Sequence, residues 1–232
     1  VKKEERRCLK THRLIPHSNF PSFEFVLQGE DPAATKCSIC QFEFAERTDL
    51  QGELVREDEE DVLTLPCSHL LHRGCFQMLK GDKEWIKCPV CSSIYGQMVG
   101  DQPNGTMTHS LHADLHCDGF PAVGTHIINY ALPSGVRAGV HFSGTHRTAY
   151  LPDTAEGREV LALLQEAFRR KLVFTVGRSV TTGRDNTVVW NGIHHKTNTS
   201  GGSAYFGFPD DTYFQRVKLE LAAKGIYSVP TS

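Results

Sequence analysis

Six cysteines and two histidines between positions 37 and 91 constrain this chain more than any other feature of its sequence. In order, they are Cys37, Cys40, Cys67, His69, His72, Cys75, Cys88 and Cys91, with a CxxC pair at each end. A CxxC pair forms a tight turn that brings two thiolates to about 2.3 Å from one zinc ion, and a closed four-ligand site has no open position for a catalytic water. Eight ligands therefore predict two complete structural zinc sites, whose metal supplies most of the folding free energy of so short a segment.

The overall composition is that of an ordinary globular protein. The 232 residues are 39% hydrophobic and 22% charged, and the formal net charge of -2 does not favour general binding to nucleic acid. No stretch approaches 18 apolar residues, and the first ten residues lack the apolar segment of a secretory signal. We expect an intracellular protein, cytoplasmic or nuclear, with no membrane segment. In a reducing compartment the clustered cysteines favour metal over disulfides, and a first residue other than Met is consistent with a piece of a longer protein.

The order of the eight ligands resembles a RING finger with two histidines, in which two ligand sets interleave as a cross-brace. The resemblance implies two zinc ions, one held by Cys37, Cys40, His72 and Cys75, the other by Cys67, His69, Cys88 and Cys91.

RING fingers typically dock a ubiquitin-conjugating E2 enzyme that carries ubiquitin. The positions that contact E2 correspond here to Ile39, Leu79 and Pro89. Many RING fingers have an arginine after the last zinc ligand, where this chain has Ser92. The resemblance therefore implies E2 docking, with ubiquitin transfer that relies on contacts other than that arginine.

The second half of the chain has the pattern of an α+β domain of about 130 residues, large enough to fold as a unit. Strands are predicted over 126–132, 172–177 and 187–193, where β-branched and aromatic residues gather between turn-rich stretches. Apolar residues at helical spacing predict helices over 153–171 and 210–225, the first with Asp153 as its N-cap and Glu156 as the partner of that cap. The residues expected to point inward are Val160, Leu161, Leu164, Ala167 and Phe168 on the first helix and Phe214, Val217 and Leu221 on the second.

Five ordered motifs closely resemble the Deltex C-terminal domain, which in that family directly follows a RING finger. They are YGQMVGDQPNGTM, AYLPDTAEGREVLALL, LVFTVGRSVTTG, WNGIHHKT and FGFPDDTYFQRVKLELAAKGI. The resemblance covers residues 37–227 and implies a RING finger over 37–92, a Deltex C-terminal domain over 96–228 and an N-terminal segment or linker over 1–36.

Membership of the Deltex family would imply both an activity and a ligand. Deltex proteins are E3 ubiquitin ligases linked to Notch signalling and DNA-damage responses, and their C-terminal domain binds ADP-ribose and NAD. In some members the RING finger and this domain together join the ubiquitin C-terminus to ADP-ribose. The implied partners are an E2 enzyme, ubiquitin and an ADP-ribosylated or Notch-pathway substrate; the sequence leaves open which E2, which substrate and which oligomeric state.

An ADP-ribose pocket needs aromatic faces for adenine, backbone N–H groups and small residues for the diphosphate, and polar side chains for the ribose hydroxyls. The residues that could supply these groups are Trp190, Tyr205 and Phe206 for the faces and Gly177, Ser179, Thr181, Thr182 and Gly183 for the phosphate side. The second set is not a P-loop, because no Gly-Lys-Ser/Thr follows. Without the family resemblance, a hydroxyl-rich turn is just a turn.

Two adjacent histidines, His194 and His195, lie outside the zinc series. At the end of a strand they would point to opposite faces, so at most one can face a given pocket. The resemblance selects His194 as a ribose or phosphate contact and leaves His195 a structural residue. Active Deltex domains pair a histidine just before the G[YF]PD motif with a later glutamate; this chain has Phe206 in place of the histidine and Glu220 as the tentative catalytic glutamate.

Two other functions stay open at this point. A zinc-stabilised ADP-ribose reader with little ligase activity would account for Ser92 and Phe206. Zinc-dependent nucleic-acid binding is disfavoured by the net charge. A third metal site at His109, His112, His116 and Cys117 lacks a CxxC turn, so we expect these residues to lie at the surface.

Overall fold

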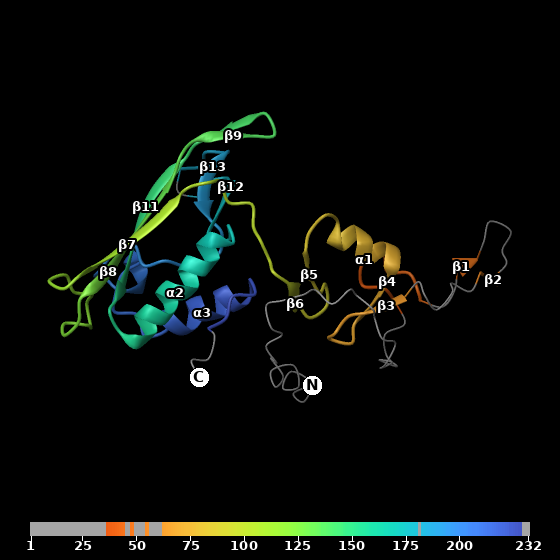
Figure 1. Ribbon diagram of the computed structural model, residues 1–232, viewed down its shortest axis with the longest axis horizontal. Coiled ribbons are helices and arrows are strands. Elements are labelled where there is room, and N and C mark those ends of the chain that lie inside the picture. Colours follow the sequence, from red (N-terminus) through yellow and green to blue (C-terminus); the bar gives the residue numbers. More distant parts are fainter. Residues whose placement is uncertain (1–35, 45–46, 49–53, 56–61, 181, 229–232) are drawn as a thin grey trace. The chain divides into compact units, whose positions relative to one another are not determined.

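The computed structural model describes residues 36–44, 47–48, 54–55, 62–180 and 182–228. Residues 1–35 of the predicted N-terminal segment and Thr181 lie outside the described residues. The chain packs as two compact units, and the boundary between them falls between Gly74 and Cys75. Figure 1 labels the elements along the chain.

Short paired strands and one helix carry the zinc-ligand series. Strand β1 (Arg47–Thr48) pairs with β2 (Leu54–Val55), β3 (Val62–Thr64) with β4 (Leu70–His72), and β5 (Trp85–Lys87) with β6 (Ile94–Gly96), all antiparallel. Helix α1 spans Arg73–Lys80. Within the described part of 36–96, the buried apolar side chains other than cysteine are Leu63, Leu65, Leu71, Phe76 and Ile86. A core with so few buried side chains needs a further source of stability, and a metal ion bound to the ligand series would provide it.

The C-terminal domain is built on a three-stranded antiparallel sheet. Its strands are β7 (Thr106–His112), β8 (Thr125–Leu132) and β11 (Thr145–Pro152), in the spatial order β11-β8-β7. Helices α2 (Ala155–Arg169) and α3 (Tyr213–Ala222) pack against each other, and Figure 1 shows both on one side of the sheet. The predicted α+β architecture is therefore confirmed.

The core of this domain involves one face of the sheet and one stripe of each helix. On β8 alternate residues are buried, because successive side chains of a strand point to opposite faces. The buried hydrophobic residues of these elements are Ile128, Tyr130 and Leu132 on β8, Ala149 and Leu151 on β11, Val160, Leu161, Leu163, Leu164 and Ala167 on α2, and Tyr213, Phe214, Val217 and Leu221 on α3. The predicted inward faces are thus confirmed, with Phe168 only half-buried beside this core.

The start of α2 differs from the prediction. Thr154, not Asp153, is the N-cap, and its hydroxyl accepts a hydrogen bond from the backbone N–H of Gly157 at 3.0 Å. Asp153 instead accepts hydrogen bonds from His126 Nε2 at 3.0 Å and from Arg158 Nη1 at 2.7 Å. Asp and Thr are both good N-cap residues. The Asp153 carboxylate is taken up by His126 and Arg158, and residue spacing alone does not reveal these partners.

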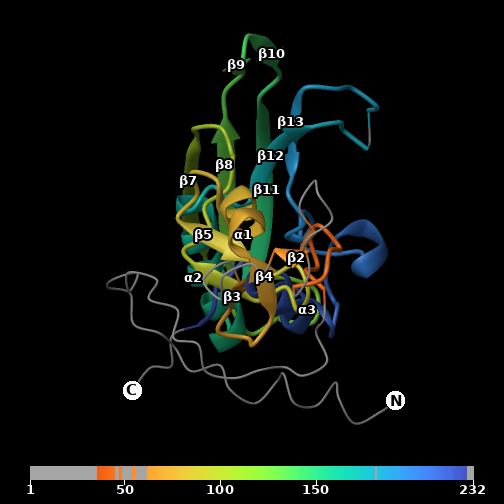
Figure 2. The same cartoon turned by 90° about the vertical axis from the view of Figure 1, so that its right-hand side faces the viewer.

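Two hairpins extend the domain. The predicted strands at 172–177 and 187–193 are confirmed as β12 (Phe174–Gly177) and β13 (Thr187–Trp190), which pair antiparallel. A second hairpin, β9 (Gly135–Arg137) with β10 (Val140–Phe142), lies in a stretch for which no strand was predicted. Figure 2 shows it projecting beyond the ends of β8 and β11. No helix in the described ranges is long and apolar enough to cross a membrane.

Candidate functional site

The eight predicted zinc ligands come together in two groups of four. One group is Cys37, Cys40, His72 and Cys75, the other is Cys67, His69, Cys88 and Cys91, and within each group the potential ligand atoms all lie within 4.8 Å of one another. These are the two interleaved sets that the RING resemblance implies.

The two CxxC turns are built alike. In the first, Gln41 has a φ of 65° and its N–H bonds back to the carbonyl of Cys37; in the second, Ser92 has a φ of 63° and its N–H bonds back to the carbonyl of Cys88. In each turn, the residue after the CxxC pair adopts the left-handed conformation, which reverses the direction of the chain. The Ser92 position is therefore part of the turn geometry as well as the place of the arginine that many RING fingers have.

The donor atoms fit a tetrahedral metal ion. Cys40 Sγ lies 3.3 Å from His72 Nδ1, and Cys67 Sγ lies 3.2 Å from His69 Nδ1. Ligands at about 2.0 to 2.3 Å from one zinc ion are roughly 3.5 Å apart along an edge of the tetrahedron. Thiolate sulfur with imidazole nitrogen is a donor set that suits zinc. Each group can hold one metal ion, and four protein ligands on each ion fit a structural role.

The three predicted E2 contacts are carried by the zinc-ligand segments. Ile39 lies inside the first CxxC pair and is half-buried, Leu79 lies on α1 four residues after Cys75 and is half-buried, and Pro89 lies inside the last CxxC pair and is exposed. Three more exposed apolar side chains, which were not predicted as contacts, lie in or beside these segments. They are Phe42 with 64%, Met78 with 76% and Val90 with 52% of their surface exposed.

His194 and Glu220, predicted for separate roles, are hydrogen-bonded to each other. The ring Nδ1 of His194 lies 2.6 Å from Glu220 Oε1, and the backbone N–H of His194 donates to Glu220 Oε2 at 2.8 Å. The carboxylate of α3 thereby fixes both the backbone and the ring of a histidine whose side chain is 60% exposed. Because a carboxylate only accepts, Nδ1 donates in this contact, and Nε2 is the ring nitrogen left for another partner.

His195 is buried and serves the core. Its Nδ1 donates to the carbonyl of Ile193 at 2.9 Å, and its Nε2 accepts from the hydroxyl of Tyr130 at 2.9 Å. Burial lowers the pKa of His195 to about 4, so the ring is neutral at neutral pH. The structural role expected for His195 fits this geometry.

Trp190 does not offer a free ring face. Phe174 stacks on it with ring centroids 4.4 Å apart and His195 with centroids 4.1 Å apart. Two rings cannot stack at such distances on the same face, so they cover opposite faces. Core packing thus uses both faces of Trp190, which argues against the prediction that this residue supplies a face for adenine. Tyr205 and Phe206, the other two aromatic residues predicted for this role, are 71% and 61% exposed.

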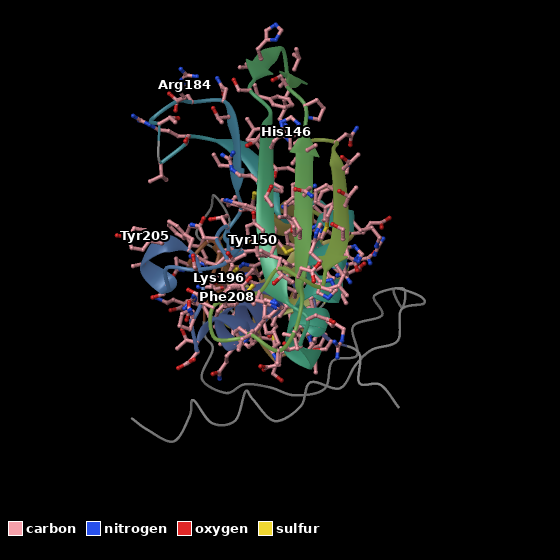
Figure 3. All side chains as sticks on the ribbon, turned by 90° about the vertical axis from the view of Figure 1, so that its left-hand side faces the viewer. His146, Tyr150, Arg184, Lys196, Tyr205 and Phe208 are labelled. Carbon is pink, nitrogen blue, oxygen red and sulfur yellow. The ribbon has the colours of Figure 1, made fainter. Side chains whose placement is uncertain are left out.

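The residues predicted for the phosphate side lie at the end of β12 and in the turn between β12 and β13. The N–H of Gly183 bonds to the carbonyl of Ser179, the N–H of Ser179 to the carbonyl of Arg184, and the N–H of Thr182 to the hydroxyl of Ser179. Gly177 ends β12. The described residues 182–186 are exposed, and Figure 3 shows Arg184 on this turn and Tyr205 on another loop, both projecting past the β11 edge of the sheet.

A buried ion pair that the sequence argument missed holds the loop with Tyr205 and Phe206. Lys196 Nζ donates to Asp210 Oδ2 at 2.6 Å and to the carbonyl of Gly207 at 2.7 Å, and the two charged side chains are 3% and 5% exposed. Burial alone would raise the pKa of Asp210, but hydrogen bonds, first of all from Lys196, hold this pKa well below its usual value. A signal was present, since Lys196 and Asp210 lie in two of the quoted motifs, WNGIHHKT and FGFPDD.

The loop itself is braced by its backbone. The N–H groups of Thr197 and Asn198 both donate to the carbonyl of Phe206, whose φ of 57° is left-handed. Non-glycine residues rarely adopt this conformation, and such strain gathers at functional sites. The loop therefore presents two aromatic rings to solvent on a fixed backbone.

A shallow cavity of about 430 Å³ lies along α3 and includes Glu220. Its other lining residues are Thr212, Gln215, Arg216, Leu219 and Ala223. Of the ADP-ribose residues predicted in the described ranges, only Glu220 is among them. The structure thus joins His194 with Glu220 but does not gather all of the predicted residues around one cavity.

Comparison with known proteins identifies the family of the C-terminal domain. The Deltex C-terminal domain family matches residues 99–226. The human probable E3 ubiquitin-protein ligase DTX3 is 47% identical over 167 residues, which cover 69% of this chain and 48% of that protein. The mouse E3 ubiquitin-protein ligase DTX4 is 37% identical over 222 residues, covering 90% of this chain and 36% of that protein, and the human E3 ubiquitin-protein ligase DTX1 is 35% identical over 217 residues, covering 87% and 35%. This chain spans about half the length of the first relative and about a third of the length of the other two. Because the family matches more than half of the chain, the chain belongs to the Deltex family.

Proposed function

We propose that this chain is an E3 ubiquitin ligase that recruits ubiquitin-loaded E2 through its zinc-binding segment. The observation that carries this proposal is the pair of interleaved four-ligand groups, 37–91, directly before a Deltex C-terminal domain. Relatives with the same C-terminal domain are named E3 ubiquitin-protein ligases. Two structural metal ions would make this segment a rigid platform, and its chemistry would be docking, with the reactive thioester supplied by E2.

Exposed apolar side chains support a docking role. Pro89 and Val90 lie in the last CxxC turn and are exposed, and Met78 on α1 is 76% exposed. Apolar side chains are expensive to leave in water, and a contiguous group of them marks a contact surface. Ile39, between two ligands of one metal group, is only half-buried and has apolar surface left for a partner.

Replacing Ile39 by alanine is expected to reduce ubiquitin conjugation by about tenfold or more, as for the central apolar residue of an interface. The measurement is conjugate formation in a reaction with E1, E2, ubiquitin and ATP. Zinc content of the variant should stay at the wild-type value, because Ile39 contributes no ligand atom.

Leu111→Ala is the matched control for Ile39→Ala. Leu111 is a 53% exposed apolar residue on β7, outside the zinc-ligand segments. Its variant should conjugate ubiquitin at the wild-type rate. Undiminished activity of Ile39→Ala would remove Ile39 from the docking surface.

For the C-terminal domain we propose binding of ADP-ribose or NAD, free or on a modified substrate, including a Notch-pathway protein. His194 offers Nε2 at an exposed position fixed by Glu220, and Tyr205 and Phe206 offer exposed rings on a braced loop. The turn between β12 and β13 offers exposed hydroxyl groups for a diphosphate, while the N–H groups of Ser179, Thr182 and Gly183 bond within the turn. The proposed cellular location is the cytoplasm or the nucleus, where ubiquitin and its E2 enzymes work.

His194→Ala should weaken ADP-ribose binding by about tenfold, since one hydrogen bond to a ribose or phosphate group is lost. Isothermal calorimetry with ADP-ribose measures the change. His116→Ala is the control, because His116 is an exposed histidine whose Nδ1 donates to the carbonyl of Val123 and which does not line the cavity along α3. No heat from the wild-type protein would remove the ligand proposal and leave the ligase proposal untouched.

A reader of ADP-ribose with little ligase activity is the second candidate, and Phe206 favours it. Phe206 takes the place of the histidine that active Deltex domains pair with a glutamate, and here Glu220 is already bonded to His194. A reaction with E1, E2 and ATP, run with and without NAD or ADP-ribose and followed by mass analysis of ubiquitin, separates the candidates. Protein conjugates support the ligase, an ADP-ribose adduct on ubiquitin supports joining of the two, and calorimetric binding without either product supports the reader.

A further inference from the structure

A second cavity, of about 460 Å³, lies in the C-terminal domain between the segment 100–104 and the β9–β10 hairpin. Its lining includes Asp101, Arg137, Lys171 and Phe142, and none of the residues proposed above for E2 or ADP-ribose. The volume is within the range of small-molecule sites, roughly 300 to 1,000 Å³.

The walls of this cavity are held by close packing. A Cβ on Gly100 would lie 2.1 Å from the carbonyl oxygen of Lys171, and a Cβ on Gly135 would lie 2.9 Å from the ring of Phe142. The N–H of Gly100 donates to the carbonyl of Arg170, and the buried Gln102 side chain accepts from the N–H of Phe174 at 3.0 Å. Segment 100–104 is therefore a fixed wall against the end of α2.

Two cations and one anion line the cavity, so its charge is positive. Arg137 Nη1 donates to Asp101 Oδ2 at 2.9 Å, and Arg137 Nη2 donates to the carbonyl of Asp101. The hydroxyl of Thr175 also donates to Asp101 Oδ2. Arg137 is therefore paired with Asp101, and the unbalanced positive charge of the cavity is that of Lys171. The Nζ of Lys171 donates one hydrogen bond, to Asn104 Oδ1 at 3.3 Å.

Lys171 occupies a backbone position that favours glycine. It follows α2 with a φ of 57°, and the N–H groups of Lys171 and Leu172 bond back to the carbonyls of Phe168 and Ala167. This is the helix ending in which glycine is the usual residue, because a side chain is strained there. The residue at this helix ending is therefore a charged lysine in place of glycine, and it lines the cavity.

We propose that this cavity binds a small organic anion, a carboxylate or a phosphate monoester with a flat apolar part. The anionic group would bind the ammonium of Lys171, the ring of Phe142 and the two prolines of the wall would contact the apolar part, and Asp101 would accept a hydrogen bond from a donor on the ligand. A ligand here lies against the hairpin that projects beyond β8 and β11 in Figure 2. The site is separate from His194 and Glu220.

The test uses phenyl phosphate, benzoate, inorganic phosphate and neutral benzyl alcohol as probes, with amide chemical shifts of the full chain as the readout. We expect phenyl phosphate, benzoate or both to shift the amides of Gly100 and Gly135, and benzyl alcohol to shift them much less. The difference between the phosphate and carboxylate arms identifies the preferred anion. Absence of any shift at these amides up to about 20 mM of each probe overturns the proposal.

Three variants of Lys171 separate charge from backbone strain. Lys171→Gln should weaken probe binding by about tenfold, and Lys171→Arg should retain it. Lys171→Gly should lose the binding while its thermal midpoint rises by about 3 °C, because glycine relieves the left-handed strain. Equal binding by wild type and Lys171→Gln overturns the site.

Two controls locate the effect. Arg147→Gln removes the same charge from an exposed residue of β11 that does not line the cavity, and it should leave binding unchanged. His194→Ala should also leave it unchanged. Shifts that disappear in His194→Ala would place the probe at the proposed ADP-ribose site and overturn the proposal.

Discussion

Cys88→Ser is expected to abolish ubiquitin conjugation and to lower the zinc content from two ions to one. Cys88 is 1% exposed and belongs to the group with Cys67, His69 and Cys91. A structural zinc site contributes roughly 10 to 16 kcal/mol of binding free energy, which equals or exceeds the roughly 5 to 15 kcal/mol of net stability of a whole domain. With so small an apolar core, the zinc-ligand segment should lose the part of its structure that the missing ion holds, and with it E2 docking, while the other group keeps its ion.

Cys117→Ser is the matched control for Cys88→Ser. Cys117 is equally buried, at 1% exposed, but it lies in the C-terminal domain, where its sulfur is 3.5 Å from the hydroxyl of Thr125. Its variant should keep two zinc ions and conjugate ubiquitin. Zinc content is measured by mass spectrometry of the metal. The fold of the C-terminal domain is measured by near-ultraviolet circular dichroism, and both variants should keep the wild-type spectrum of this domain. Wild-type activity of Cys88→Ser with one zinc would show that this metal group is not needed for docking.

The sequence was most informative where one local rule decides the structure. Helices α2 and α3 and strand β8 follow from the spacing of their apolar residues, and each lies within three residues of its predicted bounds. The two ligand groups follow from ligand order, given the RING resemblance. These features depend on residue type and spacing, which a sequence displays directly.

The missed features depend on contacts between distant residues. Strand β7 contains THSLH, which is polar and mostly exposed, and it is ordered by pairing with β8 rather than by an apolar pattern. The histidines of this stretch are exposed as expected, whereas Cys117 is buried.

Trp190 and Glu220 illustrate the same limit within the site. Both residue types suit the roles predicted for them, but the structure uses the two faces of Trp190 for Phe174 and His195, and it uses the carboxylate of Glu220 to fix His194. Residue type tells what a side chain can do, whereas its packing partners decide which of these roles stays available.

Lys196→Met is expected to destabilise the C-terminal domain by about 3 kcal/mol and to lower its thermal midpoint by about 10 °C. The reason is that Asp210, 5% exposed, would keep a buried charge without its main partner, although Arg216 still donates to it at 3.1 Å. Lys218→Met is the control, since Lys218 is 30% exposed and pairs with Glu156 and Glu159 at the surface, where such pairs contribute below about 1 kcal/mol. Denaturant unfolding of both variants measures the difference, and equal losses would contradict the role given to the buried pair.

The double variant Lys196→Met with Asp210→Asn separates the ion pair from simple packing. Removing both charges should be less harmful than removing Lys196 alone, because no buried charge is then left unpaired. The double variant should still lose ADP-ribose affinity if the proposed site is correct, since the ammonium of Lys196 also anchors the carbonyl of Gly207, next to Phe206. If the double variant regains stability but not ADP-ribose affinity, Lys196 fixes the loop that carries Tyr205 and Phe206. If it regains both, this loop holds its shape without the lysine.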